Sequence, residues 1–165
     1  MEGISDLVER LRAAGVPVDD STAEAMSSVD LGNFTDHDTE LFLMDSPIPF
    51  LVTESGATKT ISAPHMVATL LHHLEIREGQ HVLLMGSKGG YLASLLDCML
   101  GPDGAVTIIE PHPEVLRYTS ERLELHNSMG LLRVLPPDAI EGWADFSRRV
   151  DRVLVTGAVR GLAPE

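Results

Sequence analysis

The sequence predicts an α/β fold with a parallel β-sheet, preceded by a helical N-terminal segment. Short apolar runs of the kind that form buried parallel strands alternate with stretches whose apolar residues recur at helical spacing. Glycine and proline turns separate the two kinds of stretch, as GPDG does at 101–104. Because strand, helix and strand follow one another, right-handed crossovers between parallel strands are expected, with strands at 82–85, 105–109, 131–135 and 152–155.

Residues 1–58 are expected to form helices and a covering loop region. Apolar residues at helical spacing indicate a first helix, which glycine and proline close: Ile4, Leu7, Val8 and Leu11, then Gly15 and Pro17. A second helix is expected to begin at Ser21, with Glu24 completing a capping box. Between Asp30 and Thr58 the periodicity is lost and irregular structure is expected. Its apolar residues indicate packing on the core: Phe42, Leu43, Ile48 and Phe50.

Residues 59–165 are expected to form the sheet core, in one structural unit with the first segment. Helical stripes lie on either side of the first strand: Val67, Leu70, Leu71 and Leu74 before it, and Leu92, Leu95, Leu96 and Met99 after it. Pro113 suits the first position of a further helix, which is expected to run to about Asn127.

Charge and composition argue against several classes of partner. The 165 residues include 25 acidic and 12 basic side chains, and the net charge of −13 would repel a nucleic-acid backbone or an anionic membrane. Aromatic residues make up 4% of the chain, too few for a base-stacking surface. No apolar run approaches the roughly 18 residues of a membrane span. Neither nucleic acid nor a membrane is therefore expected as a partner.

Cysteine and histidine usage argues against disulfide and metal chemistry. Cys98 is the only cysteine, which excludes an internal disulfide and a cysteine-cluster metal site, and a cytoplasmic location is expected. The seven histidines include no pair at i and i+4, the spacing of a helical zinc site, and His72 and His73 are adjacent. No metal is expected.

A glycine-rich turn and a downstream acid mark the candidate ligand site. GSKGGY, at 86–91, links an apolar strand to a helix, where backbone amides are able to meet a ligand. Glu110 ends the next strand, 20 residues beyond Gly90, where a carboxylate accepts hydrogen bonds from ribose hydroxyls. Lys88 breaks the dinucleotide pattern G-x-G-x-x-G, and no Ser or Thr follows it as a P-loop requires.

These stretches together resemble the protein-L-isoaspartate (D-aspartate) O-methyltransferases, a branch of the class I S-adenosylmethionine-dependent methyltransferases. The resemblance runs from about Met26 to the C-terminus. GATKTISAPHMVATLLHHL is similar to the family's signature segment, VLLMGSKGGYLASLL to its cofactor turn, and IIEPHPEVLRYTSERL to its ribose-binding strand end and helix. DSPIPF resembles the family's aspartate-arginine-proline-leucine-proline stretch, with Ser46 in place of the arginine after Asp45. The resemblance implies a three-layer, Rossmann-like methyltransferase fold.

The resemblance also implies an activity: methyl transfer from S-adenosylmethionine to the misplaced carboxylate of isoaspartyl residues in damaged proteins, which initiates their repair and releases S-adenosylhomocysteine. It implies a catalytic hydroxyl on Ser62 and substrate-binding roles for Thr60, Ile61 and His65. The cofactor-binding residues it implies are Gly86, Ser87, Gly89, Gly90, Glu110 at the ribose and Asp138 by the adenine.

Such a reaction depends on alignment, because a carboxylate is already a nucleophile and a sulfonium is already a good leaving system. Ser62, at the start of a helix, is expected to donate a hydrogen bond to the substrate carboxylate. Nearby backbone amides and the positive end of that helix are expected to help hold the anion. The structural alternative is that Ser62 or Thr60 only caps the helix ahead of Pro64.

Three departures from the family pattern weigh against catalysis. Leu84 stands where family members carry an acid. Lys88 replaces the middle glycine of the turn, where its cation either repels a sulfonium, pairs with the cofactor carboxylate or points to solvent. The C-terminal strands of the family are also missing, so a further segment, a second copy of the chain or a partner is expected to cover an open sheet edge.

Two other functions stay open. One is a non-catalytic methyltransferase-like domain that acts as a binding or assembly module, which Leu84, Lys88 and the short C-terminus favour. The other is a methyltransferase with another substrate, such as a small molecule or RNA, although the acidic charge argues against RNA. The fold alone does not decide among them, because this type of sheet supports many chemistries.

Overall fold

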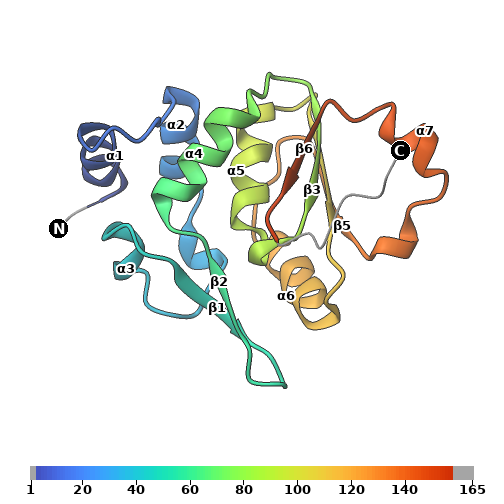
Figure 1. Cartoon of the computed structure of the whole chain (residues 1–165), viewed down its shortest axis with the longest axis horizontal. Coiled ribbons are helices and arrows are strands. Elements are labelled where there is room, and N and C mark those ends of the chain that lie inside the picture. Colours follow the sequence, from blue (N-terminus) through green and yellow to red (C-terminus); the bar gives the residue numbers. More distant parts are fainter. Residues whose placement is uncertain (1–2, 158–165) are drawn as a thin grey trace.

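A four-stranded parallel sheet forms the centre of the computed structural model, which describes residues 3–157 (Figure 1). The strands are β3 (His81–Met85), β4 (Ala105–Ile109), β5 (Leu131–Leu135) and β6 (Arg152–Val155), in the order β5-β4-β3-β6. All three neighbouring pairs run parallel. The four predicted strands are therefore confirmed, and the fold is α/β.

Helices cover both faces of this sheet. The main core joins the sheet to α4 (Pro64–Leu74), α5 (Tyr91–Leu100) and α6 (Pro113–Leu123), through residues such as Val67, Leu95 and Val115. On the opposite face, α7 (Trp143–Ser147) brings Phe146 against Leu83 and Ile109 in a second, smaller cluster. The two crossovers β3-α5-β4 and β4-α6-β5 step in one direction, so right-handed connections put α5 and α6 on the same face.

Helix α6 ends earlier than predicted, at Leu123 and not near Asn127. The chain turns there because Asp97 of α5 draws the next segment inward. The Asp97 carboxylate accepts hydrogen bonds from the His126 ring and from the backbone N–H groups of Met129 and Gly130. A continuing helix would carry these donors away from that carboxylate.

Two helices, α1 (Ile4–Ala13) and α2 (Asp20–Ser28), form the predicted N-terminal segment, and α2 packs against α5. The predicted start of α2 and its capping box are wrong. The helix begins at Asp20 with Asp19 as N-cap, and neither Ser21 nor Glu24 makes a capping hydrogen bond. The Asp19 carboxylate instead lies 3.0 Å from Nδ1 of His72 on α4, so this acid ties two helices together.

The stretch from residue 30 to residue 58 is more regular than predicted. It contains the 3₁₀ turn η1 (Leu31–Asn33), the short helix α3 (Glu40–Leu43) and strand β1 (Ile48–Val52), which pairs antiparallel with β2 (Thr58–Ile61). The sequence hides β1 because Pro49 lies inside it and the register shifts between Pro49 and Leu51. The predicted packing is confirmed, since Phe42, Ile48 and Phe50 are buried. This hairpin runs across residue 58, and the division of the chain there stays a prediction.

Strands β5 and β6 are both edge strands within residues 3–157, and β6 is the one nearest the end of the chain. Strand β6 pairs only with β3, and its Val153 and Val155 are 52% and 41% exposed. The segment RGLAPE lies outside the described residues, and a cover for this edge stays a prediction. In the part of the chain that the structure describes, no helix is long and apolar enough to cross a membrane.

Candidate functional site

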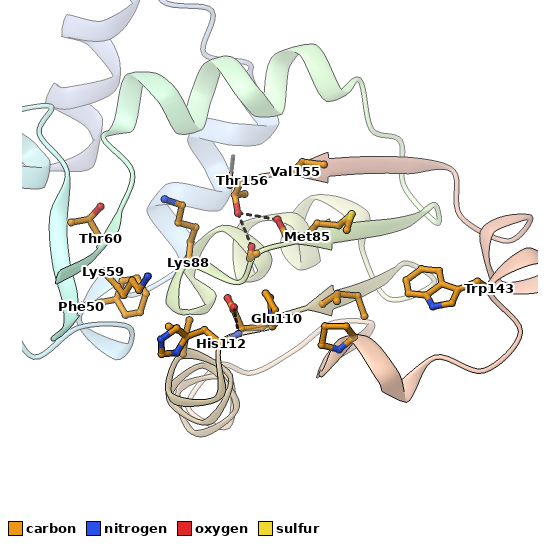
Figure 2. A pocket seen from close by; sticks show the side chains of 16 residues that line it. Phe50, Lys59, Thr60, Met85, Lys88, Glu110, His112, Trp143, Val155 and Thr156 are labelled. Carbon is orange, nitrogen blue, oxygen red and sulfur yellow. Dashed lines mark hydrogen bonds between the residues drawn. The ribbon is translucent and has the colours of Figure 1, made fainter. Parts of the chain in front are cut away.

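A cleft of about 630 Å³ opens where the carboxyl ends of the sheet strands meet (Figure 2). Met85 and Gly86 at the end of β3, Glu110 after β4 and Thr156 after β6 all line it. The chain leaves β3 toward β4 on one side and returns as β6 on the other, so the cleft lies at a topological switch point. Ligands of parallel α/β sheets bind at such points, and the volume suits a small molecule.

Hydrogen bonds hold the glycine turn against the end of β6. Gly86 has a φ of +95°, and a Cβ at this position would stand 2.3 Å from Oγ1 of Thr156. That hydroxyl donates to the carbonyls of Met85 and Gly86, at 3.1 and 2.9 Å. Glycine is needed here because the turn and the strand end approach too closely for a side chain.

Gly89 and Gly90, which were predicted to contact a cofactor, are buried and do not line the cleft. Both have positive φ, at +78° and +102°. A Cβ on Gly89 would stand 3.0 Å from the Phe50 ring, and one on Gly90 would stand 3.3 Å from the Phe34 ring. These two glycines let the covering segment pack onto the turn, and Gly86 alone of the predicted glycines faces the cleft.

Glu110 presents a buried carboxylate to the cleft and is 7% exposed. Its Oε1 accepts hydrogen bonds from the N–H and the hydroxyl of Ser87, at 3.0 and 2.9 Å. Its Oε2 accepts one from the N–H of His112, at 3.0 Å. The Ser87 hydroxyl also lies 2.7 Å from Oγ1 of Thr119, so Ser87 stands behind Glu110 as its support. A carboxylate oxygen accepts about two hydrogen bonds, and Oε2 therefore keeps room for a ligand donor.

Two lysine residues line the same cleft. Lys59 of β2 and Lys88 of the glycine turn are both half-buried there. Neither side chain makes a hydrogen bond or ion pair within residues 3–157. Buried or half-buried lysines normally have a partner, so these two cations are available to a ligand.

Lys88 also has a strained backbone. Its φ is +49°, in the left-handed region that disfavours a side chain by about 1–2 kcal/mol. Asp45 and Glu75 are the other non-glycine residues with positive φ among those described. Glu75 is the C-cap of α4, where this conformation is common. Lys88 has no such local reason, and strain of this kind gathers at ligand sites.

The carboxylate of Asp45 binds at the start of α4. Its N-cap is Ala63, and Asp45 accepts a hydrogen bond from the His65 N–H at 2.8 Å and lies 2.9 Å from the His65 ring. The N–H groups of Met66 and Val67 bond back to the Ala63 carbonyl, and Pro64 has none. The first amides of this helix are therefore engaged within the protein, and the expectation that nearby backbone amides hold a substrate anion stays a prediction. The alternative, a cap by Ser62 or Thr60, is wrong.

The residues of the TISAPHM segment lie at different depths. Thr60 lines the cleft, whereas Ile61 is buried in the main core. Ser62 is half-buried just beyond β2, outside the cleft lining, and its hydroxyl makes no hydrogen bond within the described residues. His65 is exposed and faces Asp45. Of the four residues, only Thr60 shares the cleft with Gly86 and Glu110.

Apolar side chains form the far end of the cleft. Ile109, Pro137 and Trp143 line it, and Figure 2 shows Trp143 at the end opposite Lys59 and Lys88. Asp138, which was predicted to lie by an adenine, is in the 3₁₀ turn η3 (Pro137–Ala139), exposed and outside the lining.

Leu84, which replaces the acid of the family pattern, is buried in the main core. It presents no polar group to the cleft, which lacks a carboxylate at the turn. Among the described residues that line the cleft, Glu110 is the only acid.

One other cluster of potential ligand atoms exists in the described part of the chain. Asp97, Cys98 and His126 bring their ligand atoms within 4.8 Å of one another. The Asp97 oxygens are already engaged by His126 and by two backbone N–H groups. Burial and the Asp97 charge raise the pKa of the Cys98 thiol, which disfavours the thiolate that a metal needs. These contacts therefore hold α5 and the segment after α6 together.

Comparison with known proteins accounts for this combination of fold and cleft. The sequence profile of the family "Protein-L-isoaspartate(D-aspartate) O-methyltransferase (PCMT)" matches residues 2–164. The chain belongs to this family. A protein-L-isoaspartate O-methyltransferase of Methanopyrus kandleri is 35% identical over 91% of this chain and 64% of its own length. One from Ignicoccus hospitalis is 34% identical over 94% of this chain and 71% of its own length.

Solved structures of the family share the fold. One protein-L-isoaspartate O-methyltransferase superposes with a TM-score of 0.73 at 18% identity, over 93% of this chain and 48% of that one. A relative from Plasmodium falciparum, solved in complex with S-adenosyl-L-homocysteine, gives 0.67 at 20% identity, over 89% and 69%. The predicted methyltransferase fold is thus confirmed. The chain spans about half to seven tenths of the length of these relatives.

Several residues that line the cleft were not predicted from the sequence. Thr156 and Pro137 follow the ends of parallel strands, and that position was the signal that marks them. Phe50, Lys59 and His112 carry no comparable signal, because the β1–β2 hairpin and the Glu110 hydrogen bond bring them to the cleft.

Proposed function

We propose that the chain is an S-adenosylmethionine-dependent methyltransferase that acts on the carboxylate of L-isoaspartyl (D-aspartyl) residues in damaged proteins, and so takes part in their repair. Membership of the family supports this proposal. The single observation that carries it is Glu110, a buried carboxylate that faces the cleft at the switch point of the sheet.

The cleft fits an adenosyl ligand. Oε2 of Glu110 has room to accept a hydrogen bond from a ribose hydroxyl, because the protein supplies it with only the His112 N–H. Ile109, Pro137 and Trp143 offer an apolar wall for the adenine ring. Gly86 also lines the cleft, and it brings no side chain into it. Asp138 stays a prediction as an adenine contact.

The chemistry needs no protein acid or base. S-adenosylmethionine supplies a methyl group on a sulfonium, so the substrate carboxylate gains the O–C bond, the S–C electron pair goes to sulfur, and a methyl ester and a neutral thioether result. The protein's contribution is alignment of the reacting atoms. Hydroxyl groups suit this task, and Thr60 in the cleft and Ser62 beside it are the candidates to hold the substrate carboxylate.

Ile61 and His65 would act on the substrate indirectly. Ile61 anchors the segment in the core, one residue before Ser62. His65 and Asp45 fix the start of α4, three residues after it. We propose positioning roles for both, so that replacing them shifts the Ser62 backbone and does not remove a contact to substrate.

A cytoplasmic location is part of the proposal. One cysteine, half-buried, suits a reducing compartment. Cell fractionation tests it, and recovery with secreted or membrane fractions would contradict it.

The proposal is tested by transfer of a labelled methyl group from S-adenosylmethionine to a synthetic isoaspartyl peptide. Label is expected in that peptide, as a base-labile ester, and not in the isomer with a normal aspartyl bond. Ser62→Ala is expected to lower kcat/KM about 10- to 100-fold, the usual effect of losing one positioning hydrogen bond. Binding of S-adenosylhomocysteine without any transfer would favour the non-catalytic binding module instead.

A further inference from the structure

The chain contains only two lysines, Lys59 and Lys88, and both line the cleft. Its ten other basic residues are arginines, and no arginine of the described part lines the cleft. We propose that these two lysines form a carboxylate-binding end of the cleft and thereby determine which charged ligands it accepts. The inference rests on the proposed adenosyl ligand and adds the group that anchors its amino-acid end.

The two lysines come from separate elements and meet at one end of the cleft. Lys59 lies on β2 beside Thr60, and Lys88 lies in the glycine turn. Figure 2 shows both at the end that also holds Phe50, with Glu110 between them and Trp143. A ligand with its ring against Trp143 and its ribose at Glu110 therefore directs its remaining end toward the lysines.

No acid of the described residues neutralises this end. The Glu110 carboxylate already accepts three hydrogen bonds from Ser87 and His112, and Leu84 has no charge to offer. Within residues 3–157, two half-buried lysines thus have no counter-ion, although the net charge of the chain is −13. A carboxylate would accept charge-assisted hydrogen bonds from both, which are among the stronger polar contacts in proteins.

The left-handed backbone conformation of Lys88 also supports a ligand-binding role. This conformation is tolerated readily by glycine, yet a lysine occupies it at the ligand site. Its long side chain reaches the cleft from the turn itself, which a glycine does not do. The lysine therefore adds a charge that a glycine turn lacks.

Ligand charge then becomes a basis for selection. In an adenosyl amino acid the sulfur lies between the ribose and the carboxylate, so a sulfonium would lie near the two lysines and be repelled, while a neutral thioether would not. The cleft is therefore expected to bind S-adenosylhomocysteine more tightly than S-adenosylmethionine. The carboxylate that the lysines hold has two possible sources, the adenosyl ligand or the isoaspartyl substrate, and the ligands used in the test separate them.

Calorimetric titration of the full chain provides the test. The first ligand pair is S-adenosylhomocysteine and 5′-methylthioadenosine, which lacks the amino-acid carboxylate. The second pair is an isoaspartyl peptide and the same peptide with that side chain amidated. The variants are Lys59→Gln and Lys88→Gln. Arg117→Gln is the matched control, because it removes an exposed cation outside the cleft.

Each lysine variant is expected to weaken S-adenosylhomocysteine binding about 10-fold and to leave 5′-methylthioadenosine unchanged, since only the first has a carboxylate to lose. Loss confined to the isoaspartyl peptide would support the same carboxylate site with the substrate as its occupant. If both carboxylate ligands bind and neither affinity changes, or if Arg117→Gln has the same effect, the inference is overturned while the proposed function stands. If the unsubstituted chain binds neither ligand, both fall.

A second readout uses the scarcity of lysine. Reductive ¹³C-methylation labels the two lysines and the N-terminal amine, and Lys59→Arg and Lys88→Arg assign the two lysine signals in an NMR spectrum. Both signals are expected to shift with S-adenosylhomocysteine and not with 5′-methylthioadenosine. Equal shifts with both ligands would contradict a carboxylate contact.

Discussion

The two charged regions of the cleft differ in how far the protein itself satisfies them. Glu110 accepts three hydrogen bonds from Ser87 and His112, and Ser87 is in turn supported by Thr119. Lys59 and Lys88 have no partner within residues 3–157, and Lys88 keeps a left-handed backbone besides. The carboxylate is therefore part of the scaffold as well as of the site, whereas the lysines belong to the site alone.

This comparison predicts that replacing a satisfied buried acid destabilises the fold, whereas replacing an unsatisfied lysine affects mainly the ligand. The largest expected effect is at Asp97, which is 2% exposed and holds three donors as Glu110 does. Asp97→Ala is expected to lower the free energy of unfolding by about 3–5 kcal/mol, because it leaves His126 and two N–H groups unpaired. Urea denaturation measures this change in the free energy of unfolding, and Asp103→Ala, at an exposed position, is the control.

Glu110→Gln comes next. The amide keeps the shape but turns one acceptor into a donor that faces Ser87 or His112, so a loss of about 1–3 kcal/mol in the free energy of unfolding is expected. Glu124→Gln, at an exposed position, is the matched control. An unchanged urea midpoint for Glu110→Gln would mean that the carboxylate has no part in the scaffold.

Lys88→Gly is expected to act in the opposite direction on stability. Relief of the left-handed strain, less the greater flexibility of unfolded glycine, should raise the free energy of unfolding by about 0.5–1 kcal/mol. Glu75→Gly has the same starting φ of +49° and should gain a similar amount, but it lies outside the cleft. Thermal unfolding compares the two. A loss of stability in Lys88→Gly alone would mean that the lysine supports the fold.

The smallest effect concerns pH and His81, whose ring lies 2.8 Å from Oγ1 of Thr107, away from the cleft. Burial lowers the pKa of His81 below its usual 6.5. The unfolded chain therefore binds a proton more readily, so this contribution to stability is full above pH 6.5 and is lost as the pH falls toward the folded pKa. His81→Gln should flatten that part of the stability profile. An unchanged slope between pH 7 and about 5 would contradict the assignment.

Much of the fold was predictable because each strand of the sheet is a short apolar run, and the two central strands, β3 and β4, are buried beneath the helices that cover the sheet. That pattern located β3 to β6 in the sequence. It failed for β1, where Pro49 and a register shift mask the alternation. The capping-box pattern failed at the start of α2, where Asp19 is the N-cap and neither Ser21 nor Glu24 makes a capping hydrogen bond.

The site was predictable only in part, for a related reason. The rule that parallel strands end at one edge placed Gly86 and Glu110 together. By contrast, the contact between Asp45 and His65 depends on the tertiary fold, and it engages the His65 N–H, one of the amides that the sequence left available for an anion. Lys59 and Lys88 are half-buried and have no partner within residues 3–157. The sequence could not predict this, because it depends on how the hairpin packs beside the turn.

The central claim, that the cleft at the strand ends binds the adenosyl ligand, is tested most directly by titrating S-adenosylhomocysteine into ¹⁵N-labelled chain and following the backbone amides and the Trp143 indole by NMR. Saturable shifts are expected, centred on Gly86, Ser87 and His112, with the Trp143 indole among them. Shifts centred instead on the hollow lined by Leu7, Arg10 and Met44, or no shifts at millimolar ligand, would contradict it.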